Sequence, residues 1–349
     1  MRLEPRERVP AWLSVLAPAF ALAATVAAAA ALVAAAGAPV DKAFHLMLEG
    51  ALGSGFAVNE MLTRATPLVL TGLAVSVAFR AKLWNIGAEG QLYMGALAAT
   101  ALGTGLVDLP APLMLPLLVV AGALAGAAML AWPALLKTRF GVDEVVVTLL
   151  SNFLVALLVS MLLEGPLKDP MGLGWPQSEP IVAEGELPKL VPGMRLHAGF
   201  LLALALALAT WIVMSRTTLG FRIRAVGLNA VAARFAGIGV GRTILWTALL
   251  SGGLAGIAGV GEVAGLKGNL TTDLSPGFGY AGIVVATLAR LHPLGVVLSA
   301  IFVASIFVGA DAMSRGAGVP SYIADVIVAV ALLSMLVALL FLRYRVSRR

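Results

Sequence analysis

Residues 216–243, RTTLGFRIRAVGLNAVAARFAGIGVGRT, form a polar stretch between two apolar segments, and this arrangement decides the class of fold. The flanking segments, 199–214 and 244–260, are almost wholly apolar, so the stretch is expected to join two membrane-spanning helices. It contains five arginines. Because an excess of Lys and Arg marks the cytoplasmic loops of membrane proteins, the stretch is predicted to be a cytoplasmic loop.

The composition of the whole chain also indicates a membrane protein. Hydrophobic residues make up 60% of the 349 residues, charged residues make up 12%, and the mean hydropathy is +0.98. A soluble globule needs many more charged residues to cover its surface. The absence of cysteine excludes disulfides, thiolate metal sites and cysteine nucleophiles. The expected fold class is therefore an all-α polytopic membrane protein.

Apolar runs along the chain predict ten helical spans. The expected spans are roughly 11–36, 65–79, 90–107, 112–132, 144–163, 198–214, 244–262, 276–289, 293–310 and 321–342. Because 65–79 and 276–289 are shorter than the roughly 20 residues that a crossing helix needs, eight to ten crossings are expected. Short spans are either completed by flanking residues or are broken helices whose free backbone groups line a cavity.

The distribution of basic residues predicts the orientation of this single transmembrane domain, residues 1–349. With residues 1–10 inside, most of the 24 Lys and Arg residues fall on the inner side, including those of the tail 343–349. Both termini are therefore expected in the cytoplasm. The loop 164–197 is then extracytoplasmic. The first apolar run is too long for a signal peptide, so an uncleaved helix is expected there.

Within the polar stretch, four apolar residues recur at three- and four-residue spacing, which predicts one apolar face of a short helix. They are Leu228, Val231, Phe235 and Ile238. Asn229 is the expected N-cap and Gly237 the expected C-terminal stop. A helix of about two turns is too short to persist alone in water, so it needs a surface to dock against. The alternative is an ordinary inter-helix loop whose arginines only set the topology.

A first polar break, FRAKLWNIGAEGQLYMG at residues 79–95, places Asn85, Glu89 and Gln91 between apolar runs. A carboxylate near the bilayer is costly and usually faces protein or water. These three residues are therefore predicted to lie near a transport pathway or its gate. The alternative is a tight cytoplasmic turn with a solvated Glu89.

A second polar break, LKGNLTTDLSPGFGY at residues 266–280, contains Asn269 and Thr272. The two sets of spans in 65–163 and 244–342 begin on opposite membrane faces, which suggests inverted repeats. Matched interruptions in two such halves indicate a transport site near the midplane. Asn269 and Thr272 are therefore predicted to lie near the same pathway or gate.

Two motif regions resemble one family of transport proteins. The string NIGAEGQ, residues 85–91, follows a helix spelled LTGLAVSVAFR. The polar stretch is followed by LSGGLAGIAG, residues 250–259. Both regions are similar to ABC importer permeases of the branched-chain amino acid, simple sugar and nucleoside branch, and NIGAEGQ is closest to the nucleoside and simple-sugar subset. Departures from the family pattern occur at Leu228, Ala230 and Phe235, where Glu, Pro and Tyr are usual.

The resemblance implies a type II-like ABC importer permease whose polar stretch, a coupling loop, seats its helix in a groove of a separate ATPase subunit. The implied coupling residues are Gly227, Asn229, Ala233, Arg234, Phe235 and Gly237. A second, different permease subunit and an extracytoplasmic substrate-binding protein are the other implied partners, in a bacterial inner membrane. The chain itself would be non-catalytic, with ATP and Mg on the ATPase. Nucleosides are the favoured solute, followed by simple sugars.

Sequence motifs for chemistry are missing, which supports a non-catalytic subunit. No HExxH, phosphate-binding GxxxxGK[ST] or complete GxSxG occurs, and the three histidines are widely separated. No metal site or nucleic-acid partner is expected. The competing hypothesis is a secondary transporter or channel working without an ATPase, which would use ionisable groups deep in the spans. A membrane scaffold is a third class.

The outer loop carries several acidic residues, among them Glu179, Glu184 and Glu186. They are predicted to dock a substrate-binding protein through its basic patches, whereas the alternative is a simple extracytoplasmic cap. Small residues four apart, such as Gly122/Gly126 and Gly252/Gly256, predict close helix packing in the membrane.

Overall fold

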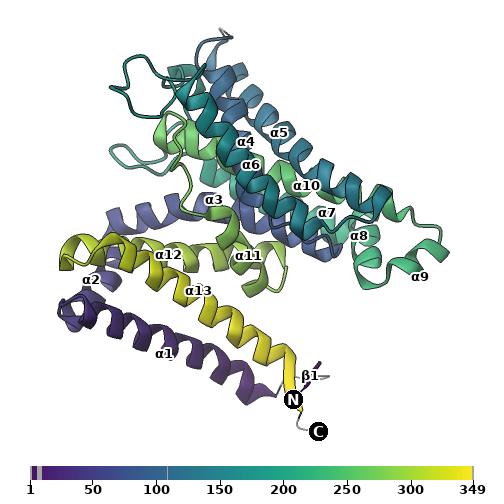
Figure 1. Ribbon diagram of the computed structural model, residues 1–349, viewed down its shortest axis with the longest axis horizontal. Coiled ribbons are helices and arrows are strands. Elements are labelled where there is room, and N and C mark those ends of the chain that lie inside the picture. Colours follow the sequence, from purple (N-terminus) through teal and green to yellow (C-terminus); the bar gives the residue numbers. More distant parts are fainter. Residues whose placement is uncertain (1, 6–9, 108, 348–349) are drawn as a thin grey trace. The chain divides into compact units, whose positions relative to one another are not determined.

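The computed structural model describes residues 2–5, 10–107 and 109–347, and nearly all of this part of the chain is helical (Figure 1). The helices are α1 (Ala11–Ala35), α2 (Val40–Leu52), α3 (Gly55–Arg80), α4 (Ala88–Gly103), α5 (Ala111–Phe140), α6 (Glu144–Glu164), the 3-10 turn η1 (Ala183–Gly185), α7 (Gly199–Arg216), α8 (Thr218–Leu228), α9 (Ala230–Phe235), α10 (Val240–Gly261), the π-helix η2 (Glu262–Lys267), α11 (Phe278–Leu288), α12 (Pro293–Ala317) and α13 (Ser321–Arg343). The predicted helical membrane fold is confirmed. Parts of the predicted terminal segments, residues 1, 6–9 and 348–349, lie outside the described residues.

Each of the ten expected spans coincides with a helix. Among the described residues, six helices have the length and hydropathy of a membrane span: α3, α5, α6, α7, α10 with η2, and α12. The expected shortness of 276–289 is confirmed, since α11 has 11 residues. The short run 65–79 is completed by flanking residues, the first of the two predicted alternatives, because α3 has 26 residues. Its first half carries buried polar side chains such as Asn59 and Thr63, which lower the hydropathy without ending the helix.

The contacts divide the chain into two compact units, residues 1–61 with 302–349 and residues 62–301. In the first unit, α1 packs along α13. The strands β1 (Arg2–Pro5) and β2 (Tyr344–Ser347) pair antiparallel beside them. The helix α2 packs on α12 through glycines, since an added Cβ on Gly50 would lie 2.1 Å from the Cβ of Ala312.

The core of the second unit is formed by α4, α5 and α10, which approach one another through glycines. An added Cβ on Gly252 would lie 2.3 Å from the carbonyl oxygen of Gly126, and one on Gly256 would lie 2.1 Å from that of Gly122. Gly95 on α4 faces the backbone of Gly256 in the same way. In a lipid bilayer the hydrophobic effect does not drive helices together, because the lipid tails are as apolar as the side chains. Close backbone approach instead provides van der Waals packing between the helices. The small-residue faces predicted from the sequence are confirmed.

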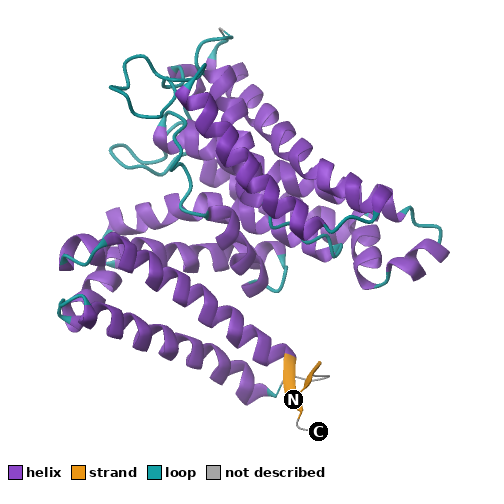
Figure 2. Ribbon diagram, in the orientation of Figure 1, coloured by secondary structure: helices purple, strands orange, loops and turns teal. Residues whose placement is uncertain are grey.

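The second unit carries the long loop between α6 and α7 at one end and the helices α8 and α9 at the other (Figure 2). The loop between α6 and α7 is bound to η2 and its C-cap, because the amide of Ile181 donates to Gly268 O at 2.8 Å and that of Leu187 donates to Ala264 O at 2.7 Å. At the other end, α8 and α9 connect α7 to α10. The helix α7 thus leads from the long loop to α8 and α9, and α10 leads back to the loop end.

The element lengths agree with the predicted repeat. The series α3, break, short α4, α5, α6 is followed later by α10 with η2, break, short α11, α12, α13. In both series a long helix precedes a non-helical break and a helix of fewer than 18 residues. The inverted relation of the two series stays a prediction.

Candidate functional site

Two short helices of the second unit begin in contact with each other. The first turn of α4 contains Glu89, and the amide of Gly279, in the first turn of α11, donates to its Oε2 at 2.6 Å. An added Cβ on Gly279 would lie 2.2 Å from the amide nitrogen of Glu89, so only glycine permits this approach. Thr71 Oγ1 on α3 donates to Phe278 O at 3.0 Å and holds the start of α11. We call the contact between Glu89 and Gly279 the helix junction.

The helix junction lies deep in the unit. From Phe278, the 11 residues of α11 extend about 16 Å at 1.5 Å per residue. They end close to Leu291, whose carbonyl accepts from the guanidinium of Arg80 at the end of α3. About 16 Å is half the thickness of a bilayer hydrocarbon core of about 30 Å. Glu89 is 8% exposed, and the positive ends of both helix dipoles favour its carboxylate there.

Asn85 and Gln91, both predicted site residues, form a reciprocal amide pair beneath the junction. Asn85 Nδ2 donates to Gln91 Oε1 at 2.9 Å, and Gln91 Nε2 donates to Asn85 Oδ1 at 2.8 Å. Asn85 Nδ2 also donates to Ser251 Oγ at 3.1 Å, and Ser251 donates to Ala74 O at 2.7 Å. The three side chains are at most 1% exposed. In this conformation they connect α4, α10 and α3, because a buried amide needs protein partners for its donors.

The extended segment before α4 is held by polar residues of α6. The amide of Trp84 donates to Glu144 Oε1 at 3.1 Å. Asn152 Nδ2 donates to Ile86 O at 2.9 Å, and its Oδ1 accepts from the amide of Gly90 at 2.9 Å. Asn152 therefore satisfies backbone groups that a broken helix leaves free, which is the requirement for irregular backbone within a membrane.

The second polar break reaches the same region through Thr272 but not through Asn269. Tyr93 on α4 donates its hydroxyl to Thr272 O at 2.8 Å and accepts from the amide of Ser275 at 3.2 Å. Asn269 is half-buried at the long-loop end, next to Leu270, whose amide donates to Ser178 Oγ. The structure thus connects Asn85, Glu89, Gln91 and the backbone of Thr272 through α4, whereas Asn269 lies apart from them.

Sequence reasoning missed Tyr93, Asn152 and Ser251 as members of this network. Tyr93 lies two residues after Gln91 in the same break, and Asn152 is an isolated amide in an otherwise apolar span. An amide in such a span signals a buried hydrogen-bond partner. Ser251 has no comparable signal in the sequence, because its bond to Asn85 crosses 166 residues.

The loop at the opposite end holds the predicted short helix, α9. Asn229 caps it, because its Oδ1 accepts from the amides of Val231 and Ala232 at 3.0 Å each. Gly237 has a φ of +78° after the last turn, and its amide donates to Arg234 O. The predicted N-cap and C-terminal stop are both confirmed.

The loop helix has one buried side and one exposed side. Ala233 is 4% exposed and packs with Ile238 against a cluster that includes Leu83 and Ile244. Gly227 lies against the end of α3, since an added Cβ there would be 1.8 Å from Arg80 O. In contrast, the exposed fractions are 82% for Leu228, 65% for Val231 and 89% for Phe235. These three form an unpartnered apolar face, named the loop face. Ile238 was expected on the same face and packs inward.

At the long-loop end, a histidine is buried beside the π-helix. The side chain of His197 is 1% exposed, and its Nδ1 accepts from the amide of Gly199 at 3.2 Å. Burial lowers the pKa of His197 to about 4, and Lys189 adds a repulsive charge. The imidazole lies against Gly265 of η2, where an added Cβ would meet it at 2.3 Å. Glu179, Glu184 and Glu186, predicted to dock a partner, are exposed on this loop.

The membrane spans, the helix junction and the exposed loop helix define a multi-pass membrane transport component. The family described as branched-chain amino acid transport system, permease component, matches residues 57–344, so the chain belongs to this family.

Three ABC transporter permease proteins are similar to this chain over most of its length. A glucose ABC transporter permease protein of Haloferax volcanii is 40% identical over 99% of this chain and 93% of its own length. A guanosine ABC transporter permease protein of Bacillus subtilis is 35% identical over 91% of this chain and 92% of its own. A nucleoside ABC transporter permease protein of Lactococcus lactis is 31% identical over 80% and 79%. No solved structure matches the chain.

Proposed function

We propose that the chain forms the translocation pathway of an ABC importer and that a separate ATPase subunit drives it through the coupling loop. The observation that carries this proposal is the loop face. Val231 and Phe235 on the six-residue helix α9, with Leu228 at the end of α8, lie exposed outside the apolar spans. A helix this short gains stability from packing, and its apolar side has no partner within the described chain.

The predicted coupling residues have different roles in the proposed coupling. Phe235 belongs to the docking surface itself. Asn229 and Gly237 begin and end the helix, while Gly227 and Ala233 seat it on the bundle. Arg234 is exposed beside the face and is available to pair with an acidic partner. ATP and Mg would reside on the ATPase.

Uptake and ATP hydrolysis in the reconstituted complex test the coupling. Phe235→Asp and Val231→Asp place a charge on the loop face and are expected to lower uptake at least about tenfold, since burying an unpaired charge costs well over 1.4 kcal/mol. Phe221→Asp on α8, where the side chain is 59% exposed, is the matched control. Membrane abundance should stay constant. Wild-type uptake in both α9 variants, or equal loss in the control, would reject docking through α9.

Ala233→Arg is unsuitable for this test. Ala233 is packed in the bundle, so a large charged side chain would displace the loop from it. Gly237→Asp is informative, because an L-residue at φ +78° strains only the exposed end of the helix.

The solute proposed first is a nucleoside, as the NIGAEGQ resemblance implies, and two nucleoside-type relatives support it. Glucose is the second candidate, because the relative of higher identity is a glucose permease protein. Competition separates them: labelled guanosine uptake that excess glucose leaves unchanged supports the nucleoside. Glucose uptake that guanosine does not inhibit would reverse the choice.

The proposed assembly has both termini and the coupling loop in the cytoplasm of a bacterial cell. Its partners would be the ATPase, a second and different permease subunit, and an extracytoplasmic binding protein docking on Glu179, Glu184 and Glu186. Purifying the tagged chain from mildly solubilised membranes tests this composition. Recovery of an ATPase with a second permease supports it, whereas recovery of the chain alone, with a control complex intact, favours gradient-driven transport.

A further inference from the structure

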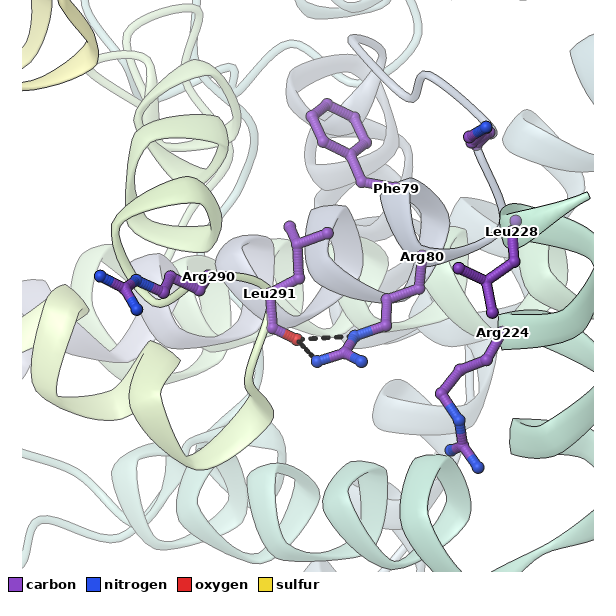
Figure 3. Close-up of a pocket in the computed structure, with 8 residues that line it drawn as sticks. Phe79, Arg80, Arg224, Leu228, Arg290 and Leu291 are labelled. Atoms are coloured by element: carbon purple, nitrogen blue, oxygen red, sulfur yellow. Dashed lines mark hydrogen bonds between the residues drawn. The ribbon is translucent and has the colours of Figure 1, made fainter. Parts of the chain in front are cut away.

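A basic pocket of about 310 Å³ is lined partly by α8 of the coupling loop (Figure 3). It forms where α3 and α11 end and where α8 makes its last turn. Its cationic lining residues are Arg80, Lys82, Arg224 and Arg290. No carboxylate lines it, and none of the four cations forms an ion pair within the described residues. The pocket therefore concentrates positive charge without a counter-ion from this part of the chain.

The charges of the pocket repel one another. Arg80 is fixed in place, because its Nε and Nη2 donate to Leu291 O at 3.1 and 2.9 Å. Arg224, on α8, is close enough to act on Arg80 as a like charge. The C-terminal ends of α3 and α11 each contribute only about half a negative charge. The end of α8 adds a third half charge. Three half charges do not neutralise four cations, so an anion in the pocket would relieve repulsion between α3 and α8.

The backbone around the pocket is unusual. Among the described residues, four non-glycine residues have positive φ, and three of them line this pocket: Lys82 at +54°, Arg290 at +51° and Leu291 at +59°. A left-handed position after a helix is usually occupied by glycine, which adopts it without strain. In this pocket the left-handed positions are occupied by Lys82, Arg290 and Leu291, so they place cationic side chains at the ends of α3 and α11. Strained residues of this kind cluster at ligand clamps.

We propose that this pocket binds a phosphate group carried by the headgroup of an anionic membrane lipid. Guanidinium groups present paired donors that match phosphate oxygens. Phe79, Leu228 and Leu291 add an apolar wall for the part of the lipid next to the phosphate. Basic pockets between membrane helices are suited to such headgroups. The bound phosphate would tie α8 of the coupling loop to α3 and α11.

Native mass spectrometry of the full-length chain in detergent, titrated with phosphatidylglycerol or phosphatidylcholine, tests the site. Arg224→Gln and Arg290→Gln are each expected to weaken phosphatidylglycerol binding about fivefold, since a cation near an anionic lipid contributes about 1 kcal/mol. Arg224→Lys keeps the charge without the paired donors, so its phosphatidylglycerol affinity should lie between those of the wild type and Arg224→Gln. Arg222→Gln is the matched control, because Arg222 is exposed on the same helix and does not line the pocket.

Inorganic phosphate provides the second arm. If millimolar phosphate displaces phosphatidylglycerol and binds the wild type but not the variants, the phosphate site is supported and a soluble anion is its source. Equal loss in Arg222→Gln, or phosphatidylglycerol binding no tighter than phosphatidylcholine, overturns the proposal. The proposal is also overturned if the Arg224 and Arg290 variants bind lipid normally but no longer copurify with the ATPase subunit. That result would assign the pocket to an acidic side chain of the partner.

This site is independent of docking through α9, because lipid binding is measured on the chain without an ATPase. Phe235→Asp is expected to keep wild-type phosphatidylglycerol binding while losing coupled uptake. All variants are compared by their elution volume on size exclusion, so that a misfolded protein is recognised before binding is interpreted.

Discussion

At the residue scale, Glu89 shows how a carboxylate is accommodated deep among membrane helices. Its Oε2 accepts from the amide of Gly279, and it lies at the positive ends of α4 and α11. Helix ends and backbone amides thus compensate the charge of this carboxylate, and its role in the transport pathway stays a prediction. The position of Glu89 in a polar break was readable from the sequence, but its partner 190 residues away was not.

Removing this acceptor should weaken the fold. In Glu89→Ala the amide of Gly279 loses its hydrogen bond while buried, which destabilises by about 1–3 kcal/mol. Glu89→Gln keeps an acceptor oxygen and should cost less. Thermal unfolding in detergent measures both, with the exposed Glu164→Ala as control. Equal loss in Glu89→Ala and Glu89→Gln would mean that the charge, not the hydrogen bond, matters.

His197 predicts a pH dependence of stability. Its pKa is about 4 in the folded chain and about 6.5 when exposed, so the unfolded state binds the proton more tightly. The protonation of His197 therefore does not affect the free energy of unfolding above about pH 6.5. This free energy falls by up to about 3 kcal/mol as the pH decreases towards 4.

Thermal unfolding between pH 7.5 and 4.5 tests this prediction. The wild type should lose stability on acidification, and His197→Gln should show a shallower dependence from a lower starting value. His292→Gln alters an exposed histidine and should follow the wild type. An unchanged slope in His197→Gln would exclude this residue as the source.

At the scale of elements, the approach of α5 and α10 depends on particular glycines. Gly256→Ala would place a Cβ 2.1 Å from Gly122 O, and backbone cannot yield as a flexible side chain does. Gly253→Ala on the same helix would meet Ala123 O at 3.4 Å, an ordinary contact. The first change should destabilise by about 1–3 kcal/mol or more, and the second should be nearly neutral. Unfolding temperatures in detergent distinguish them, and similar values would contradict this packing.

The extent of α3 shows the limit of hydropathy at this scale. Apolar periodicity located every long helix but placed the start of α3 ten residues late. Asn59, Thr63 and Thr66 are buried in this helix, with exposed fractions of 4% or less. Hydropathy averages treat such residues as solvent-facing, whereas packing against other helices makes them interior. Helix ends are therefore predicted less well where an interior is polar.

At the scale of the whole molecule, the proposed orientation makes a labelling prediction. The chain contains no cysteine, so a single introduced thiol reports one position. Trp175→Cys, where the side chain is 73% exposed on the long loop, should react with an impermeant maleimide in intact cells. Phe235→Cys on the loop face should react only after permeabilisation. The reverse pattern would place the coupling loop outside and reject an ATPase partner there.

The sequence by itself determined the membrane class, the existence of every long helix, the short span at α11 and the capping of α9 by Asn229. These depend on hydropathy, length and hydrogen bonds within a few residues, all of which are local along the chain. Only the tertiary structure decided that Asn85 pairs with Ser251, that Ala233 is buried while Phe235 is exposed, and that Arg80, Arg224 and Arg290 share one pocket. Such contacts join residues more than 60 positions apart. They depend on how closely glycine-bearing helices approach, which no local pattern specifies.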